Sequence, residues 1–118
     1  MGKQGFRDLN VWQKSKYLAV HIYKVTGTGV FCKDLSLRDQ IRRSAVSIAS
    51  NIAEGDERDT DKDSVRFFYI AKGSLAELLT QTIISREIGY LTEEEFEYIS
   101  GECEIIAKML GKLIKARS

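Results

Sequence analysis

Few side chains in this sequence are of the types that carry out chemistry. His21 is the single histidine, and Cys32 and Cys103 are the two cysteines. A di-iron bundle needs Glu-x-x-His pairs, which the sequence lacks, and a nucleophilic cysteine would need His21 beside it in space. Cys103 occupies an apolar helix position and is expected to be a buried, reduced thiol, whereas Cys32 is expected in a loop. We therefore expect no catalytic, metal or cofactor site, no small-molecule substrate and no enzymatic activity.

A group of polar residues on two neighbouring predicted helices could instead form a structural network. Its members recur at helical spacing, which places each set on one face of its helix. The group comprises Arg43, Asn51, Glu54, Arg66, Ser74, Glu77 and Gln81. Because partly buried polar groups need partners, we favour a network between helices or subunits over a ligand pocket. Arg43 and Glu77 are expected to be partly buried and ion-paired, either within the bundle or across subunits.

Basic residues are the candidate contacts to nucleic acid. Lys108, Lys112 and Lys115 are spaced i, i+4 and i+7 and so line one helix face. Further candidates on the first two predicted helices are Lys14, Lys16, Arg38 and Arg42. No aromatic residue alternates with these lysines, which favours binding by shape and charge over base stacking. The competing interpretation is that the lysines are solvated and pair with neighbours such as Glu104.

Four helical segments must position these groups. Apolar residues recur at steps of three and four within residues 8–25, 37–54, 61–88 and 93–116. Gly55 is expected to end the second segment, and the sequence contains no proline to interrupt any of them. Short connections between long helices predict one all-α domain over residues 1–118, an antiparallel up-down-up-down four-helix bundle.

Capping residues mark where three of these helices begin. Ser36 is the expected N-cap of the second helix, with Asp39 three residues later in a capping box. Thr60 is the expected N-cap of the third helix. Thr92 and Glu95 form a stronger capping box at the start of the fourth.

The second and third predicted helices carry more apolar surface than one core requires. Apolar and small residues span about 200° of the second helix, wider than a single core-facing stripe. On the third helix, Ile70, Ile84 and Ile88 lie to one side of the main stripe. A small bundle has one interior, so the surplus predicts packing against other subunits.

Composition narrows the class of protein further. The chain has 118 residues, of which 43% are hydrophobic and 30% charged, so a disordered protein is excluded. The sequence shows no leader and no apolar run long enough to span a bilayer, so we expect a cytoplasmic protein without a membrane partner. The net charge of +1 is lower than that of most nucleic-acid-binding domains. The charge is also unevenly distributed, since residues 87–104 hold seven acidic and no basic residues.

Several motifs carry a family resemblance. They are FRDLNVWQ at 6–13, QIRRSAVSI at 40–48, NIAEG at 51–55, FFYIAKGSLAEL at 67–78 and Gly89-Tyr90-Leu91. In this order, over nearly the whole chain, they closely resemble the bacterial four-helix-bundle family of 23S rRNA intervening-sequence proteins. Members are similar to the accessory protein of diversity-generating retroelements. The resemblance implies a homopentamer, a ring of bundles around a central channel, with no enzymatic activity attached to it.

The chain departs from this family in two respects. The family usually has proline in the first interhelix loop and after the Ser-Ile of the second helix, where this chain has Ala49. The retroelement accessory proteins are markedly basic, whereas this chain is nearly neutral.

Two functional hypotheses follow. The first is a non-enzymatic, oligomeric binding or scaffold protein whose partner is rRNA, another structured RNA or a nucleoprotein. The second is a protein–protein adaptor without a nucleic-acid role, in which residues 87–104 bind a basic partner. Salt dependence separates them, because phosphate contacts weaken steeply as salt rises.

Overall fold

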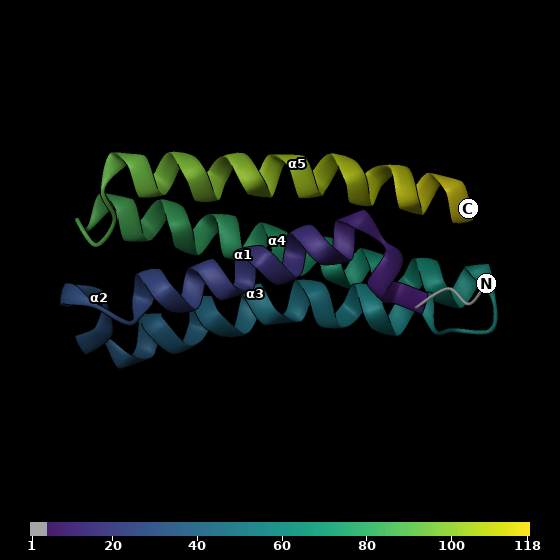
Figure 1. Ribbon diagram of the computed structural model, residues 1–118, viewed down its shortest axis with the longest axis horizontal. Coiled ribbons are helices and arrows are strands. Elements are labelled where there is room, and N and C mark those ends of the chain that lie inside the picture. Colours follow the sequence, from purple (N-terminus) through teal and green to yellow (C-terminus); the bar gives the residue numbers. More distant parts are fainter. Residues whose placement is uncertain (1–4) are drawn as a thin grey trace.

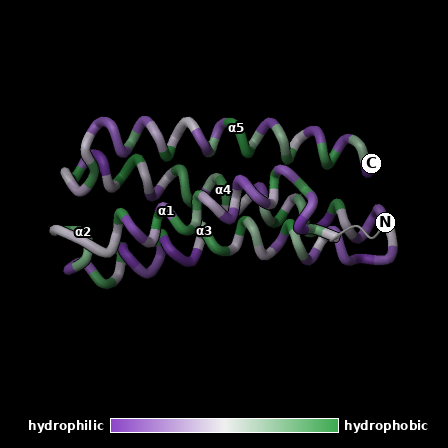
Figure 2. The backbone as a smooth tube through the Cα atoms, viewed as in Figure 1, coloured by the Kyte–Doolittle hydropathy of each residue, from purple (hydrophilic) through white to green (hydrophobic). Residues whose placement is uncertain are grey.

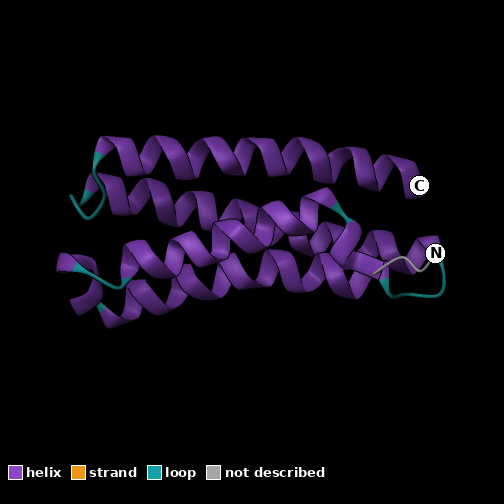
Figure 3. Cartoon of the chain, in the orientation of Figure 1, coloured by secondary structure: helices purple, strands orange, loops and turns teal. Residues whose placement is uncertain are grey.

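Helices account for nearly all of residues 5–118, which are the residues that the computed structural model describes (Figures 1 and 3). The elements are a 3-10 turn η1 (Gly5–Asp8) and the helices α1 (Asn10–Thr26), α2 (Gly29–Lys33), α3 (Leu35–Asp56), α4 (Asp61–Glu87) and α5 (Glu93–Arg117). No strand occurs within this range. The prediction of an all-α bundle built on four long helices is confirmed.

Three of the four long helices, α3, α4 and α5, begin at side-chain caps, and one of these caps differs from the prediction. At the start of α1, the N-cap residue Leu9 makes no side-chain capping bond. Thr60 accepts a hydrogen bond from the backbone N–H of Asp63, and Thr92 forms the expected capping box with Glu95. At the start of α3, however, the cap is Asp34, whose carboxylate accepts from the Leu37 N–H at 3.1 Å. The prediction of Ser36 as N-cap is therefore wrong. Asp34 lies two residues earlier and satisfies one of the N–H groups left unpaired in the first turn of α3.

The N-terminal part of the chain contains two short elements, η1 and α2, besides α1, which corresponds to the helix predicted over residues 8–25. The η1 turn ends at Asp8, and Leu9 has extended backbone angles before α1 begins. Cys32, expected in a loop, lies in the short helix α2. This helix is held in place because the side chain of Phe31, which is 2% exposed, packs into the core. Burial of Phe31 therefore orders a segment that carries no helical repeat of its own.

Gly55 lies inside α3 instead of ending it. A Cβ atom at this position would lie 2.6 Å from Cε1 of Phe68 and 3.0 Å from the carbonyl oxygen of Ser64. Glycine is therefore required because α4 approaches the backbone of α3 closely here, and α3 continues to Asp56. Gly55 therefore allows α3 and α4 to pack closely and does not end the helix.

The core is one apolar stripe from each long helix. Side chains that are essentially inaccessible to solvent include Leu18, Ile22, Ile41, Ile48, Ile52, Phe68, Leu78, Ile99, Ile106 and Leu110. Figure 2 shows these apolar segments alternating with polar ones along each helix. In α5 the stripe consists of Ile99, Cys103, Ile106, Leu110 and Ile114, whereas Leu113 is only partly buried.

The four long helices follow one another around the bundle, which measures 45 × 24 × 23 Å. α3 packs against both α1 and α4, and α5 packs against α4 (Figure 1). α1 and α5 pack less closely than the other neighbouring pairs. The bundle therefore has four sides, each formed by two neighbouring helices.

Candidate functional site

Serine side chains connect α3 to α4 at half height of the bundle. The hydroxyls of Ser47 and Ser74 lie 2.8 Å apart, and the Asn51 amide donates to the carbonyl and hydroxyl oxygens of Ser47. One turn away, the Ser44 hydroxyl donates to the buried Oε1 of Gln81 at 2.7 Å. The structure therefore brings together Asn51 and Ser74 of the predicted network, with Ser47 between them.

Of the core pair of Ser44 and Gln81, the network prediction included Gln81 and missed Ser44. Both residues are buried, with Gln81 7% exposed. Their signal in the sequence is a polar residue beside the apolar stripe of each helix. A buried amide of this kind needs a partner across the helix interface, which could have identified the pair.

Other members of the predicted network make local contacts. Glu54 is paired with Arg58 on its own helix, and Arg66 is paired with Asp63 at 3.2 Å. These pairs are spaced four and three residues apart and do not link helices.

Arg43 and Glu77 remain apart in the single chain. Both side chains are exposed, and no ion pair joins them within residues 5–118. The expectation of a partly buried pair within the bundle is therefore wrong. The alternative, a pair across subunits, stays a prediction.

An apolar groove runs along the side formed by α1 and α3. It has a volume of about 510 Å³, and its lining comprises Phe6, Trp12, Lys16, Ala19, Val20, Tyr23, Val46, Ala49, Ser50 and Ala53. Small residues of α3 form the floor, so a neighbouring helix can approach closely. Arg43 lines an adjoining pocket together with Tyr23 and Val46. Asp39 and Arg42 line the same pocket, and Lys16 lines the groove. This side therefore combines an apolar surface with basic residues, of which Arg43 forms no ion pair within residues 5–118.

The adjacent side, formed by α3 and α4, carries an apolar ridge. Ile70, Ile84 and Ile88 are 43%, 46% and 51% exposed, respectively. Glu77 lies between Ile70 and Ile84 at intervals of seven residues, which places all three near one line along α4. A carboxylate surrounded by exposed isoleucines is an unusual surface for a single chain in water.

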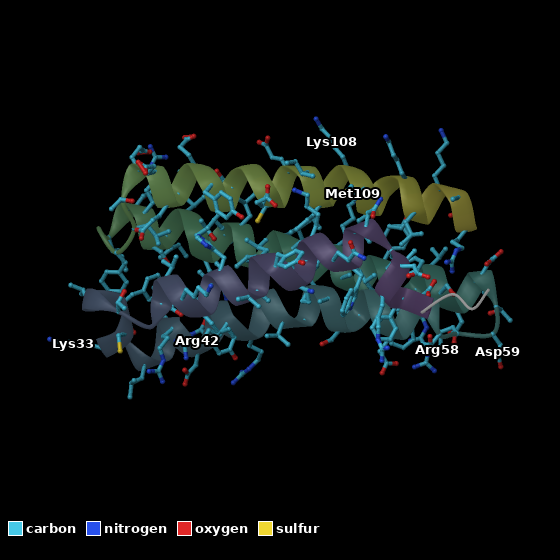
Figure 4. The ribbon with its side chains drawn as sticks, in the orientation of Figure 1. Lys33, Arg42, Arg58, Asp59, Lys108 and Met109 are labelled. Atoms are coloured by element: carbon cyan, nitrogen blue, oxygen red, sulfur yellow. The ribbon has the colours of Figure 1, made fainter. Side chains whose placement is uncertain are left out.

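Four of the predicted nucleic-acid contacts have partners within the chain. Arg42 donates from Nε to the Thr26 hydroxyl at 2.8 Å and lies over the Tyr23 ring, so it holds the end of α1 (Figure 4). Arg38 is paired with Asp39 at 3.1 Å.

On α1, Lys14 is paired with Glu102 of α5 at 3.2 Å, and the ammonium of Lys16 lies 4.2 Å from the centroid of the Tyr17 ring. Lys14 therefore joins α1 to α5 and Arg42 joins α3 to α1, whereas the Lys16–Tyr17 and Arg38–Asp39 contacts are local to one helix.

The remaining three lysines form an open basic stripe on α5. Lys108, Lys112 and Lys115 are exposed, and no ion pair joins them to Glu104 within the described chain. Figure 4 shows Lys108 pointing away from the other helices. We call these three residues the α5 lysine stripe.

The side chains of Cys103 and His21 lie in different surroundings. Burial raises the pKa of the Cys103 thiol to about 12, helped by the nearby carboxylates of Glu102 and Glu104. His21 packs against Tyr98 with ring centroids 4.5 Å apart, and burial lowers its pKa. Across residues 5–118, no three His, Cys, Asp or Glu side chains are grouped so as to hold a metal ion. None of the described helices combines the length and the hydropathy that crossing a membrane requires.

These features define a helical bundle whose distinctive surfaces are an apolar groove, an apolar ridge and a basic stripe. The model of the 23S rRNA-intervening sequence protein family matches residues 7–112, and the chain belongs to that family. This confirms the resemblance carried by the sequence motifs.

A solved structure is similar over most of the chain. It is the crystal structure of a protein of unknown function from the S23 ribosomal protein family of Bacteroides thetaiotaomicron. The two share 30% sequence identity and superpose with a TM-score of 0.82, covering 89% of this chain and 98% of the other. No protein with a curated description matches this chain.

Proposed function

We propose that this protein is a non-enzymatic, cytoplasmic scaffold that assembles with copies of itself and binds structured RNA. The observation that carries the proposal is the pair of apolar surfaces on adjacent sides of the bundle, the α1–α3 groove and the α4 ridge. Exposed isoleucines beside an apolar groove are typical of an interaction surface. The homopentamer implied by the family resemblance would use such surfaces five times.

The RNA partner is supported by two observations. The family to which the chain belongs is described by its link to 23S rRNA. The α5 lysine stripe presents three exposed cations that form no ion pair within residues 5–118, at positions that suit contacts to phosphate. A single stripe would bind RNA weakly. An oligomer repeats the stripe, and several linked contacts then act together because each raises the effective concentration of the next.

A gel-shift titration with structured rRNA fragments tests the proposal at low and moderate salt. We expect binding by the wild type that weakens as salt rises, because phosphate contacts release counterions. Changing Lys108, Lys112 and Lys115 to Glu should abolish it. The matched control changes Lys24, Lys33 and Lys62 to Glu, which alters the net charge equally at exposed positions elsewhere.

Two outcomes would contradict the RNA role. One is the absence of a shift at low salt. The other is an equal loss of binding in the stripe variant and the control variant, which would show a general charge effect. Either result would favour the adaptor hypothesis, in which exposed acidic residues such as Glu94, Glu97 and Glu104 bind a basic protein.

A further inference from the structure

We infer that the subunits assemble head to tail, with the α1–α3 groove of one copy receiving the α4 ridge of the next and Glu77 facing Arg43 of its neighbour. This inference rests on the proposed self-assembly and specifies the surfaces that produce it. Both surfaces lie on the same chain, on adjacent sides that share α3, so neither needs a different partner.

Arg43 and Glu77 lie at similar positions along the long axis of the bundle. From the contact between Ser47 and Ser74, Arg43 lies four residues toward one end of the bundle, and Glu77 lies three residues toward the same end. At a rise of about 1.5 Å per residue, these steps are about 6 and 4.5 Å. In a ring whose axis is parallel to the helices, each residue meets the neighbour's residues at its own level. Glu77 of one copy therefore meets Arg43 of the next.

The apolar groups match in the same register. Ile70 lies four residues from Ser74 in the opposite direction, and Ser50 of the groove lies three residues from Ser47, so their levels differ by only about 1.5 Å. Ile70 therefore reaches the small-residue floor beside Ser50. Toward the other end, Ile84 lies close to the level of Leu35, which is 58% exposed at the start of α3. One register thus brings together the apolar and charged groups of both surfaces.

The angle between the two surfaces favours a closed ring. Adjacent sides of a four-helix bundle meet at roughly 90° along their shared helix. A ring requires a wedge of about 90° per copy for four copies and about 72° for five. An angle of roughly 90° matches four copies, and narrowing it by about 18° closes the five copies that the family resemblance implies, with α3 facing the central axis. A two-fold dimer through either side would leave the other apolar surface in water.

Reversal of the two charges tests this interface. Glu77→Arg and Arg43→Glu should each raise the dissociation constant of the assembly by about tenfold or more, because like charges then face each other. The double variant should recover most of the wild-type affinity. The matched control is Lys72→Glu with Glu104→Arg on the α4–α5 side, which should assemble like the wild type. Dissociation is measured by light scattering over a dilution series.

The outcomes separate the interface from the proposed assembly. A monomeric wild type would overturn both. An oligomeric wild type whose single charge reversals assemble normally, or whose double variant is no better than either single variant, would overturn the interface alone.

Disulfide cross-linking provides a second readout that does not depend on the charges. In a Cys32→Ser background, Ser50→Cys combined with Ile70→Cys should form a ladder of covalent oligomers that ends at the closed ring. Each single substitution should yield no ladder, because one surface then lacks its partner thiol. Covalent dimers that never extend would show a two-fold contact and overturn the head-to-tail arrangement.

Discussion

The hydroxyl groups of Ser47 and Ser74 lie 2.8 Å apart and set the register between α3 and α4. Because a helix rises by a constant step, this one contact also determines how every exposed residue of α4 is placed relative to α3. It puts Glu77 and Arg43 at nearly the same level on adjacent sides of the bundle. The polar contacts between the helices thereby determine how the outer surfaces are aligned.

The buried pair of Ser44 and Gln81 should contribute measurably to stability. In Ser44→Ala the Oε1 atom of Gln81 loses its donor while remaining buried, which costs about 1–3 kcal/mol of the free energy of unfolding. Chemical unfolding at a fixed protein concentration measures the loss. The double variant Ser44→Ala with Gln81→Leu should be more stable than Ser44→Ala, since neither side then carries an unpaired polar group. Equal stability of Ser44→Ala and wild type would contradict this account.

Gly55 should not tolerate a side chain. Gly55→Ala places a Cβ against the Phe68 ring and the Ser64 carbonyl oxygen, and the required shifts should destabilise the fold by about 1–3 kcal/mol. Gly101 provides the matched control, because a Cβ at this position in α5 meets open space. Gly101→Ala should stabilise the protein by about 0.5–1 kcal/mol. Thermal unfolding of both variants tests the contrast, and a neutral Gly55→Ala would contradict the close packing.

The difference between these two glycines shows what sequence patterns can and cannot reveal. Gly55 follows a helical stretch and precedes an acidic segment, a pattern typical of a helix end. Its actual role depends on Phe68, which follows the interhelix connection. Local signals therefore predicted the existence and length of the helices well, whereas close contacts between helices could not be predicted because they depend on tertiary packing.

The same distinction applies to the candidate interface. Helical spacing was sufficient to identify the α5 lysine stripe and the surplus isoleucines of α4. It could not show that Arg42 bonds to Thr26 or that Lys14 pairs with Glu102, because both contacts join different elements. Spacing also predicted one network for Arg43, Asn51, Glu54, Arg66, Ser74, Glu77 and Gln81. In the structure these residues divide into a serine–asparagine contact, a buried bond between Gln81 and Ser44, local ion pairs and two exposed charges.

His21 should make stability depend on pH below neutrality. Its pKa in the folded chain is lowered, chiefly by burial, so the unfolded chain binds the proton more readily. The contribution of neutral His21 is therefore present above its unfolded pKa of about 6.5 and is lost as pH falls through that value toward the lower folded pKa. His21→Phe keeps a ring against Tyr98 and should show a smaller decrease in stability between pH 7.5 and 5.5. Identical pH profiles for the two proteins would contradict the prediction.

Cys103 and Cys32 should differ in reactivity. A pKa of about 12 and burial in the core leave almost no accessible thiolate at Cys103 near neutral pH. Brief treatment with iodoacetamide at pH 8 should therefore modify Cys32 alone, and both cysteines should react after unfolding in denaturant. Mass spectrometry of proteolytic peptides identifies the sites. Rapid modification of Cys103 in the folded protein would show that the core opens more readily than its packing indicates.

Self-assembly is the central claim, and the solution mass of the wild-type protein tests it most directly. Light scattering coupled to size exclusion at micromolar concentration should give five times the 13.4 kDa of the chain. The apolar groove and ridge would then be covered by neighbouring copies. A homogeneous species of 13.4 kDa would mean that both surfaces remain exposed to water, and it would contradict the account.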